Sequence, residues 1–289
     1  MKSPIEIRSL QESDIPEMHR AFVRAFSDYP LAFKMDKEQF VRKFVHRLHI
    51  DFELSGGAFA GGRMVGFIFT AVGGYRGLTA AYNGGTGVIP EFRGRGVAFA
   101  IYQELIEKFR KKDIEQCVLE VLTGNKRAIA VYERSGFRMS RLFRCFKLDK
   151  SDFNGKAANP AATAKLQKDA NWDLYKSFVS SEGSFMDQFD RLHLDFKHQK
   201  LLEVRSQGAC VGFSVFQPDI GRASHFAVKE EERRKGFGAA LFREMISGGQ
   251  ASFLTVLNVD DGDLPVRRFL QQIGFSNTVN QYEMILKLK

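Results

Sequence analysis

The sequence predicts a mixed α/β fold that occurs twice along the chain, each copy being a mixed central sheet flanked by helices. Three observations lead to this prediction. Strand-like segments alternate with segments of helical periodicity in both halves. A basic, glycine-rich loop begins at Arg93 and again at Arg233, 140 residues later. A Gly-Phe pair follows each loop, at Gly136 and Gly274, 138 residues apart. Two landmarks at nearly the same offset indicate an internal duplication.

The first half opens with a short strand and two helices. Apolar and polar residues alternate over residues 5–10, as they do in a strand. Asp14 is a candidate N-cap for a helix that ends near Phe26. Asp36 is a candidate start for the second helix, whose apolar residues recur every four positions.

A hairpin and a glycine-rich strand come next. Residues 52–62 and 64–72 have the pattern of paired strands, and residues 81–89 form a third strand that Pro90 ends. The basic loop then opens an amphipathic helix. Three elements complete this half in the order strand, helix, strand, at residues 117–123, 125–136 and 141–149.

The second half repeats this order less regularly. Its hairpin is expected over residues 201–217, and residues 222–228 form the strand before its loop. Between the halves lies a small, polar and non-periodic stretch that is typical of a linker. We therefore predict a first domain at 1–150, a linker at 151–164 and a second domain at 165–289.

Composition places the chain among globular proteins. Of its 289 residues, 44% are hydrophobic and 27% are charged. No run of about 18 apolar residues occurs, so no membrane span is expected. Charges near the N-terminus argue against a secretory signal. The three cysteines do not make a disulfide framework. These features predict a cytoplasmic protein.

The net charge of +9, from 43 basic and 34 acidic residues, favours an anionic partner. The basic residues are scattered along the chain, so a phosphorylated cofactor is favoured over nucleic acid, which is not expected as a partner. His46 and His49 share one helix face, but no cysteine or carboxylate at a suitable spacing accompanies them. No metal site is therefore expected.

The loop at residues 93–98 has the composition of an anion-binding turn. Glycine tolerates positive φ, so successive backbone N–H groups can point into one concavity. The helix that follows adds a partial positive charge at its N-terminus. Arg93 and Arg95 are candidates for charge-assisted contacts. The glycine spacing is neither that of a Walker loop nor that of a Rossmann fingerprint. A basic turn with no ligand is the alternative reading of these residues.

Two motifs carry a family resemblance. Arg93, Gly96 and Ala98 form Arg-x-x-Gly-x-Ala, which resembles the acetyl-CoA pyrophosphate loop of the GNAT superfamily of N-acetyltransferases. Residues 119–137 resemble the strand and helix that follow this loop in that superfamily. The first half thus resembles a complete GNAT domain and the second half, from about residue 165, a weaker copy. The whole chain is similar to tandem-GNAT acetyltransferases.

This resemblance implies how acetyl-CoA, the co-substrate, would be held. The strand that ends at Ile89 would separate from its neighbour, and its backbone around Val88 would bind the acetyl and pantetheine groups. Backbone N–H groups of the loop would hold the pyrophosphate, and Asn125, which also caps its helix, would contact the pantetheine arm. The implied cofactor-binding residues are Val88, Ile89, Arg93, Gly94, Arg95, Gly96, Val97, Ala98 and Asn125.

Glu120 is the candidate general base. It lies in a strand of apolar residues, where a carboxylate is costly to bury. It is therefore expected to face a cleft or a polar partner. Some GNAT enzymes place a catalytic Glu at this position, acting directly or through water. The alternative is a structural Glu that pairs with a loop or with Arg127 or Arg141.

Tyr132 is the candidate general acid. It lies on the next helix, at the position from which the family delivers a proton to the CoA sulfur. The alternative role is that of a core aromatic. Cys117 is a further candidate, as an acyl carrier, but no histidine or lysine flanks it. Direct transfer in a ternary complex is therefore preferred.

The second copy departs from the family pattern. Its loop retains Arg-x-x-Gly-x-Gly, but Thr255 stands at the Glu position and Leu270 at the Tyr position. Asp263 stands at the Asn position, and Pro265 is expected to interrupt the start of the helix. Catalysis is not expected there, whereas CoA binding stays open.

The sequence thus predicts an acetyl-CoA-dependent N-acetyltransferase that acts on a primary amine, carried by a small molecule or a peptide. The alternative is a CoA-binding sensor or assembly module without catalysis. The intact pair of Glu120 and Tyr132 favours the enzyme. A monomer or a homodimer is expected, with no membrane or nucleic-acid partner.

Overall fold

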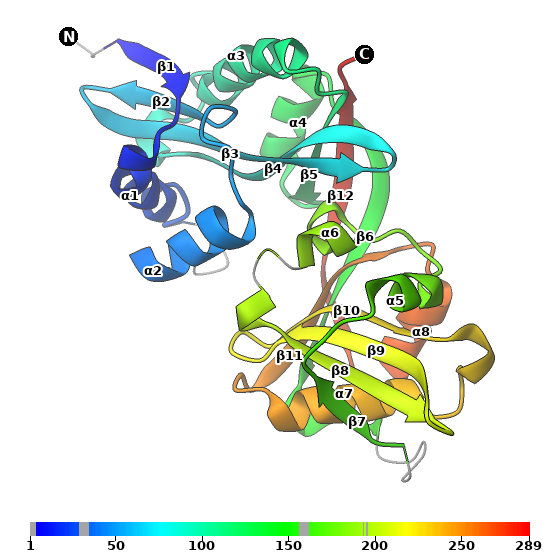
Figure 1. The fold of residues 1–289 in the computed structure, drawn as a ribbon. Coiled ribbons are helices and arrows are strands. Elements are labelled where there is room, and N and C mark those ends of the chain that lie inside the picture. Colours follow the sequence, from blue (N-terminus) through cyan, green and yellow to red (C-terminus); the bar gives the residue numbers. More distant parts are fainter. Residues whose placement is uncertain (1–3, 29–34, 156–161, 193, 195) are drawn as a thin grey trace. The chain divides into compact units, whose positions relative to one another are not determined.

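The computed structural model describes residues 4–28, 35–155, 162–192, 194 and 196–289. The chain forms two compact units (Figure 1). Unit 1 comprises the chain up to Ser140 together with Tyr282–Lys289, and unit 2 comprises Arg141–Gln281. The predicted domain limits of 150 and 165 stay predictions, and the central part of the predicted linker, residues 156–161, lies outside the described residues.

Unit 1 is a mixed sheet with the strand order β1-β2-β3-β4-β5-β12. Neighbouring strands from β1 to β4 pair antiparallel, whereas β4 and β5 pair parallel. The strands are β1 (Ile5–Ser9), β2 (Gly56–Ala60), β3 (Arg63–Tyr75), β4 (Leu78–Val88), β5 (Gln116–Leu122) and the end of β12 (Ser276–Lys287). The helices are α1 (Ile15–Ala25), α2 (Lys37–Phe40), α3 (Val97–Lys111) and α4 (Lys126–Arg134).

Helices cover both faces of this sheet, α1 and α2 on one and α3 and α4 on the other (Figure 1). Side chains along β3 point alternately to the two faces, so one strand packs against helices on both sides. Phe67 and Phe69 point toward an aromatic cluster with Phe22 of α1, whereas Ile68 packs in the core under α3. Asp36 caps α2 in a capping box, and the helix continues as a π-helix over Val41–Arg47. The predicted mixed α/β fold is confirmed.

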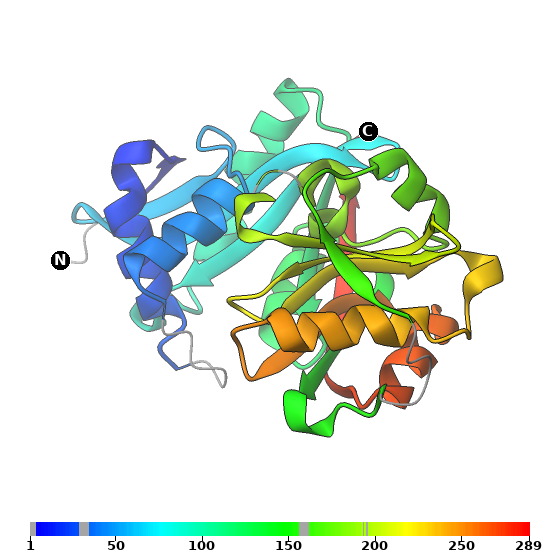
Figure 2. The same cartoon turned by 60° about the horizontal axis from the view of Figure 1, so that its bottom comes forward.

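Unit 2 repeats the design with the strand order β6-β11-β10-β9-β8-β7. Its strands are β6 (Arg138–Asp149), β7 (Ala164–Gln167), β8 (Lys200–Ser206), β9 (Ala209–Gln217), β10 (Arg222–Val228) and β11 (Phe253–Asp260). Its helices are α5 (Trp172–Phe178), α6 (Phe189–Leu192), α7 (Phe237–Gly248) and α8 (Leu264–Gln272). In Figure 2, α7 (orange) lies along the sheet, which it contacts at β7, β8, β9 and β10.

Strands β6 and β12 each begin in one unit and end in the other. The end of β12 completes unit 1, where Met284 is 1% exposed in the core and the Leu288 N–H donates to the Glu115 carbonyl at 2.9 Å. Residues 143–149 of β6 instead pair with β11 in unit 2. The sheet of unit 1 is thus completed by a strand segment that is remote from most of that unit in sequence.

Two local expectations need correction. Asp14 is at the N-cap of α1, but its carboxylate caps no N–H of that helix. It accepts from both terminal nitrogens of Arg8 at 2.8 Å and from the Gln11 N–H at 2.9 Å. Pro265 does not interrupt α8, because it lies in the first turn, where its missing N–H has no intrahelical partner to lose.

Candidate functional site

The parallel strands β4 and β5 pair over only part of their length. Their register runs from Ala80 opposite Gln116 to Asn83 opposite Leu119. Beyond that point β4 continues to Val88 and β5 to Leu122. The strands therefore separate after Asn83, and Glu120 is the first residue of β5 past the last paired one.

A bulge in β4 lies at the point of separation. The register between β3 and β4 shifts between Phe69 and Thr70, which leaves Gly84 as the extra residue. A Cβ at Gly84 would lie 2.3 Å from Leu48, so only glycine allows Leu48 at the end of the π-helix to pack on the bulge. The sequence had favoured this segment as a strand without identifying the bulge.

Asn83 holds the bulge in place with its side chain. Its amide nitrogen donates to the Thr86 hydroxyl at 2.8 Å and to the Tyr102 hydroxyl, and its amide oxygen accepts from the Gly85 N–H at 3.0 Å. Burial raises the pKa of Tyr102 well above its usual value, and the neighbouring Tyr132 adds to that effect. Tyr102 is therefore a protonated, fixed anchor of this network.

The loop before α3 has the backbone that an anion site needs. Gly94 and Gly96 both adopt a left-handed conformation with φ of 73°. Gly96 is the N-cap of α3, so the first N–H groups of the helix, from Val97 and Ala98, have no intrahelical acceptor. Their direction and the helix dipole suit a bound pyrophosphate. Arg95 lies over the ring of Phe92, 4.8 Å from its centroid.

The side chain of Arg93 makes several contacts within unit 1, and its expected contact with the cofactor stays a prediction. Its two terminal nitrogens donate to Asp28 at 2.6 and 2.8 Å, and one of them also donates to the Ala25 carbonyl at 2.8 Å. Its Nε donates to the Val88 carbonyl at 3.1 Å. Arg93 thus ties the loop to the ends of α1 and β4. The paired guanidinium holds the pKa of Asp28 below its usual value.

The ends of the implied cofactor strand are also fixed. Val88 pairs with Gly66 of β3, and the Ile89 N–H donates to the Val65 carbonyl at 3.0 Å. Asn125 accepts from the Ala128 N–H at 3.2 Å, which confirms that it caps α4. Its expected contact with the pantetheine arm stays a prediction.

Glu120 has a partner that the sequence did not single out. The hydroxyl of Tyr82, on β4, donates to Oε2 of Glu120. Tyr82 is 7% exposed, whereas Glu120 is partly exposed at the point where the strands separate. A phenol that donates to a carboxylate stabilises its charged form and fixes its direction. The structure therefore presents Glu120 as an oriented carboxylate.

Tyr132 is 7% exposed on α4 and lies in the core cluster under α3. Its ring makes edge contacts with Tyr102 and with Phe137, at centroid distances of 5.9 Å in each case. This packing fixes the ring, which both the general-acid role and the core role require. Cys117, the other candidate, is 2% exposed, and burial raises the pKa of its thiol strongly. A thiol held in its protonated form is a poor nucleophile.

The loop of unit 2 keeps the same backbone with different residues. Gly236 caps α7 at φ 85°, and Arg234 adopts φ 65° at the place of Gly94. Nε of Arg233 donates to the Val228 carbonyl at 3.1 Å, as Arg93 does to Val88. Asp263 caps α8 by accepting from the Val266 N–H at 3.2 Å.

Unit 2 contains an aromatic cluster in which one ring replaces a smaller side chain of unit 1. Phe226 of β10, Phe242 of α7 and Phe269 of α8 form one cluster, with Phe226 and Phe242 centroids 4.9 Å apart. At the 140-residue offset Phe226 replaces Thr86. A Cβ at Gly238 would lie 2.9 Å from the Phe269 ring. The ring of Phe269 thus lies against the start of α7, beside the loop.

The residues that sequence reasoning missed are Tyr82, Asn83 and Tyr102. Each lies in a pattern that reads as ordinary strand or helix, and their importance follows from contacts between elements distant in sequence. A Tyr-Asn pair before two glycines was the only local signal. Within the described residues, no group of three potential metal ligands occurs.

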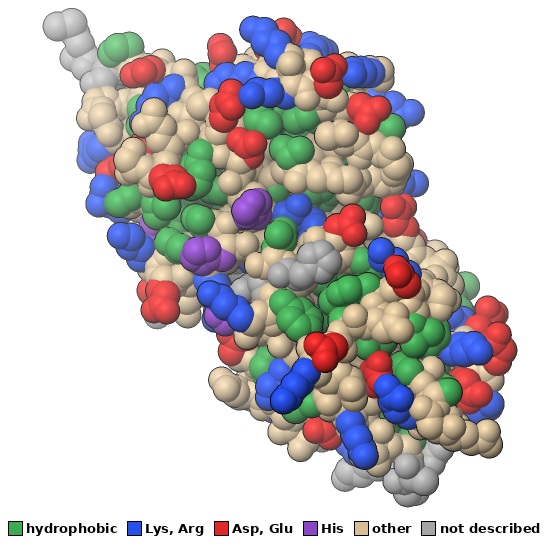
Figure 3. Space-filling model, in the orientation of Figure 1, with side chains coloured by type: hydrophobic (Ala, Val, Ile, Leu, Met, Phe, Trp, Pro, Cys, Tyr) green, Lys and Arg blue, Asp and Glu red, His purple; other side chains and the backbone are tan. Residues whose placement is uncertain are grey.

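The surface shows mixed charge on the face drawn in Figure 3. Basic side chains (blue) and acidic side chains (red) are interspersed there over both units. Among the helices in the described ranges, none has the length and apolar character that a membrane span requires.

Comparison with known proteins defines the class to which this fold belongs. A family model described as the acetyltransferase (GNAT) family matches residues 15–137 and again residues 168–275. These residues make up most of the chain, so the chain belongs to the GNAT family of acetyltransferases. The predicted tandem arrangement is confirmed as well, because the model matches each half once.

Curated relatives share part of the chain. N-alpha-acetyltransferase 30 of Schizosaccharomyces pombe is 31% identical over 107 residues, 36% of this chain and 69% of the relative. The ribosomal protein bS18-alanine N-acetyltransferase of Escherichia coli K12 is 28% identical over 138 residues, 48% of this chain and 84% of the relative. Family and relatives together confirm the predicted enzyme class, N-acetyltransferase.

Solved structures of similar fold cover nearly the whole chain. A tandem GNAT protein from the clavulanic acid biosynthesis pathway has a TM-score of 0.74 at 16% identity and covers 99% of both chains. A GCN5-related N-acetyltransferase from Sphaerobacter thermophilus has a TM-score of 0.75 at 16% identity, over 99% of this chain and 96% of its own. At such identity the likeness concerns the fold.

Proposed function

We propose that unit 1 transfers an acetyl group from acetyl-CoA directly to a primary amine in a ternary complex. The observation that supports this proposal most is the arrangement around the separated strands. Glu120 lies at the point where β4 and β5 part, and the left-handed glycines of the loop lie at the start of α3. Such a placement suits a thioester between the strands and a pyrophosphate at the helix.

In this proposal the main chain binds most of the co-substrate. The backbone at Val88 and Ile89 would accompany the acetyl and pantetheine groups, and Asn125 would contact the pantetheine arm. The loop N–H groups from Arg93 to Ala98 would bind the pyrophosphate. Arg95 would add charge, since the guanidinium of Arg93 already binds Asp28. The loop residues involved are Arg93, Gly94, Arg95, Gly96, Val97 and Ala98.

The chemistry needs a base and an acid. Glu120, held by Tyr82, accepts the proton that the substrate ammonium loses, directly or through one water. The free amine then attacks the thioester carbonyl, so that a C–N bond forms and the C–S bond breaks. The hydroxyl of Tyr132 gives its proton to the departing thiolate. The nitrogen is left with one extra proton after the attack, and the proton that it loses as the amide forms restores Tyr132 through solvent.

For the acceptor we propose an α-amino group at the end of a peptide or protein. Support comes from the printed names of two relatives, an N-alpha-acetyltransferase and a ribosomal protein alanine N-acetyltransferase. A small-molecule amine is the other acceptor class. Two peptides of one sequence, with free and with blocked N-termini, separate an α-amino acceptor from a lysine side chain.

The test measures thiol release by the full chain with acetyl-CoA and a peptide amine. Tyr132→Phe is expected to lower the turnover number by about 10²-fold or more, because the thiolate loses its proton donor. Glu120→Gln is expected to abolish the acidic limb of the pH–rate profile. Full activity of folded Tyr132→Phe would remove that residue from the mechanism. Binding of CoA without thiol release from any amine would instead favour the non-catalytic module.

A further inference from the structure

Unit 2 contains a pocket outside the site that we propose for acetyl transfer in unit 1. Its volume is about 280 Å³, which suits a ligand smaller than a typical drug. It lies beside β10, and its walls include Lys176 of α5, the segment 179–183, Phe189 of α6 and His225 of β10.

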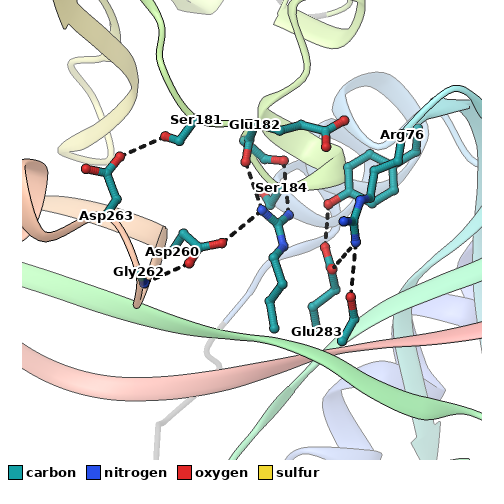
Figure 4. Close-up of polar contacts among 12 residues, drawn as sticks. Arg76, Ser181, Glu182, Ser184, Asp260, Gly262, Asp263 and Glu283 are labelled. Carbon is teal, nitrogen blue, oxygen red and sulfur yellow. Dashed lines mark hydrogen bonds and ion pairs between the residues drawn. The ribbon is translucent and has the colours of Figure 1, made fainter.

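The loop that forms one wall is held rigidly. Arg141 donates to the Glu182 carbonyl at 3.0 Å and to the Gly183 carbonyl at 3.4 Å. Ser181 donates to Asp263 at 2.8 Å, and both residues are labelled in Figure 4. Gln188, another wall residue, donates to the Gly183 carbonyl at 3.1 Å. A wall fixed from several sides is preorganised for a ligand, because little ordering remains to oppose binding.

The buried acid of the pocket already has its partners. Asp187 is 6% exposed, and its carboxylate accepts from Arg222 at 2.8 Å and from Ser184 at 2.9 Å. It is therefore neutralised by a nearby cation and contributes little attraction for a positively charged ligand. Glu182 is exposed at the rim, where water screens its charge.

Two other polar groups of the pocket lack such partners. Nε2 of His225 is shielded from solvent and has no hydrogen-bond partner, while the ring packs edge-on against Phe189 at 4.7 Å. Burial lowers the pKa of His225, so the imidazole is neutral. The ammonium of Lys176 lies 5.9 Å from the Phe189 centroid and forms no ion pair with any described residue. A cation and an imidazole are thus left to recognise an acceptor oxygen.

The pocket lies beside the bulge of β10, which corresponds to the bulge of β4 in unit 1. His225 follows the bulge residue Ser224 of β10, as Gly85 follows Gly84 in β4. On the other side of β10, however, the rings of Phe226, Phe242 and Phe269 pack together. The pocket is therefore suited to binding a ligand rather than to converting it.

We propose that this pocket binds a small carboxylate with an apolar body. The Lys176 ammonium pairs with the carboxylate, a small turn of the His225 ring lets its shielded Nε2 donate one hydrogen bond to it, and Phe189 packs on the apolar part. This pairing would give His225 the partner that it lacks. The proposal does not depend on the catalytic role of unit 1.

The only tryptophan of the chain provides a local reporter. Trp172 contacts the ring of Phe189, with centroids 6.0 Å apart. The experiment titrates the full chain with phenylacetate and follows tryptophan fluorescence. Its matched probes are 2-phenylethylamine and 2-phenylethanol, which keep the ring and replace the carboxylate by a cation or a neutral group. We expect a saturable change with phenylacetate that neither matched probe produces at the same concentration.

Variants assign that change to the pocket. Lys176→Gln, at an exposed position that tolerates substitution, is expected to weaken phenylacetate binding by about tenfold, as loss of a charge-assisted contact does. Lys165→Gln removes an exposed lysine elsewhere in unit 2 and is expected to leave binding unchanged. Tyr132→Phe is expected to leave it unchanged too, which separates this proposal from the catalytic one. No saturation, equal binding by Lys176→Gln, or preference for the amine would overturn it.

Discussion

Tyr82 shows how one side chain links the fold of unit 1 to its proposed chemistry. It precedes the bulge of β4 and reaches across to Glu120 on the parallel neighbour β5. Because the strands separate one residue later, this contact is placed where a base would meet the substrate. Tyr82 is therefore a positioning residue for Glu120 in the proposed mechanism.

Tyr82→Phe is expected to move the acidic limb of the pH–rate profile to higher pH. The reason is that the Glu120 carboxylate loses a hydrogen bond that stabilises its charged form. Steady-state kinetics across pH measure this shift. Tyr175→Phe is the matched control, because Tyr175 donates to Glu203 at 2.6 Å in unit 2. A shift of equal size in both variants would contradict the positioning role.

For single residues, the sequence predicted the roles of those that belong to a local motif. The cap at Asn125 is confirmed, and the two left-handed glycines of the loop lie where the motif placed them. Sequence reasoning did not find the role of the Arg93 side chain, because its partner Asp28 lies 65 residues away. Contacts of that range depend on the packing of elements and leave no local pattern.

The loop-helix element occurs twice with one backbone and two surroundings. Gly96 and Gly236 both begin their helices in the left-handed conformation. The start of α3 lies against β3, where Val97 packs on Gly66 opposite Val88 of β4, whereas the start of α7 carries the Phe269 ring. The backbone alone thus does not decide whether the element binds CoA.

Gly96→Ala and Gly236→Ala are expected to reduce stability alike and CoA binding differently. A left-handed alanine costs about 1–2 kcal/mol, so each variant should lower the free energy of unfolding by that amount. Only Gly96→Ala should weaken CoA binding, because its Cβ is added to the proposed pyrophosphate loop. Calorimetric titration of the full chain should give one CoA per wild-type chain. Two bound CoA molecules, or weaker binding by Gly236→Ala, would contradict the assignment of CoA binding to unit 1 alone.

Periodicity predicted which elements are helices and which are strands. It did not predict the irregularities within them. The segment after Asp36 reads as one regular helix, yet most of it is a π-helix whose end places Leu48 on Gly84. The bulge and the π-helix fit each other, so neither is determined by its own residues. The prediction that Pro265 interrupts α8 was wrong. The effect of a proline depends on its exact position, and Pro265 lies in the first turn of the helix.

For the whole molecule, the repeat predicted two similar units, but not which strand segments complete them. A boundary near residue 150 keeps all of β6 with the first half. In the structure, residues 143–149 of that strand pair with β11, and Tyr282–Lys289 join unit 1. Both segments have ordinary alternating patterns, which specify a buried strand face without specifying its neighbour. The last residues of the chain thus stabilise the unit in which the chain begins.

Met284→Ala tests this dependence of unit 1 on the C-terminal strand. Met284 is 1% exposed among core residues of unit 1, so its truncation is expected to cost about 2–5 kcal/mol. Amide hydrogen exchange should show faster exchange in β5 of unit 1, while β11 of unit 2 keeps its protection. Lys287→Ala, at an exposed position of the same strand, is the control and should alter neither. Loss of protection in unit 2 alone would contradict the assignment of this segment to unit 1, because the cavity must destabilise the core that surrounds it.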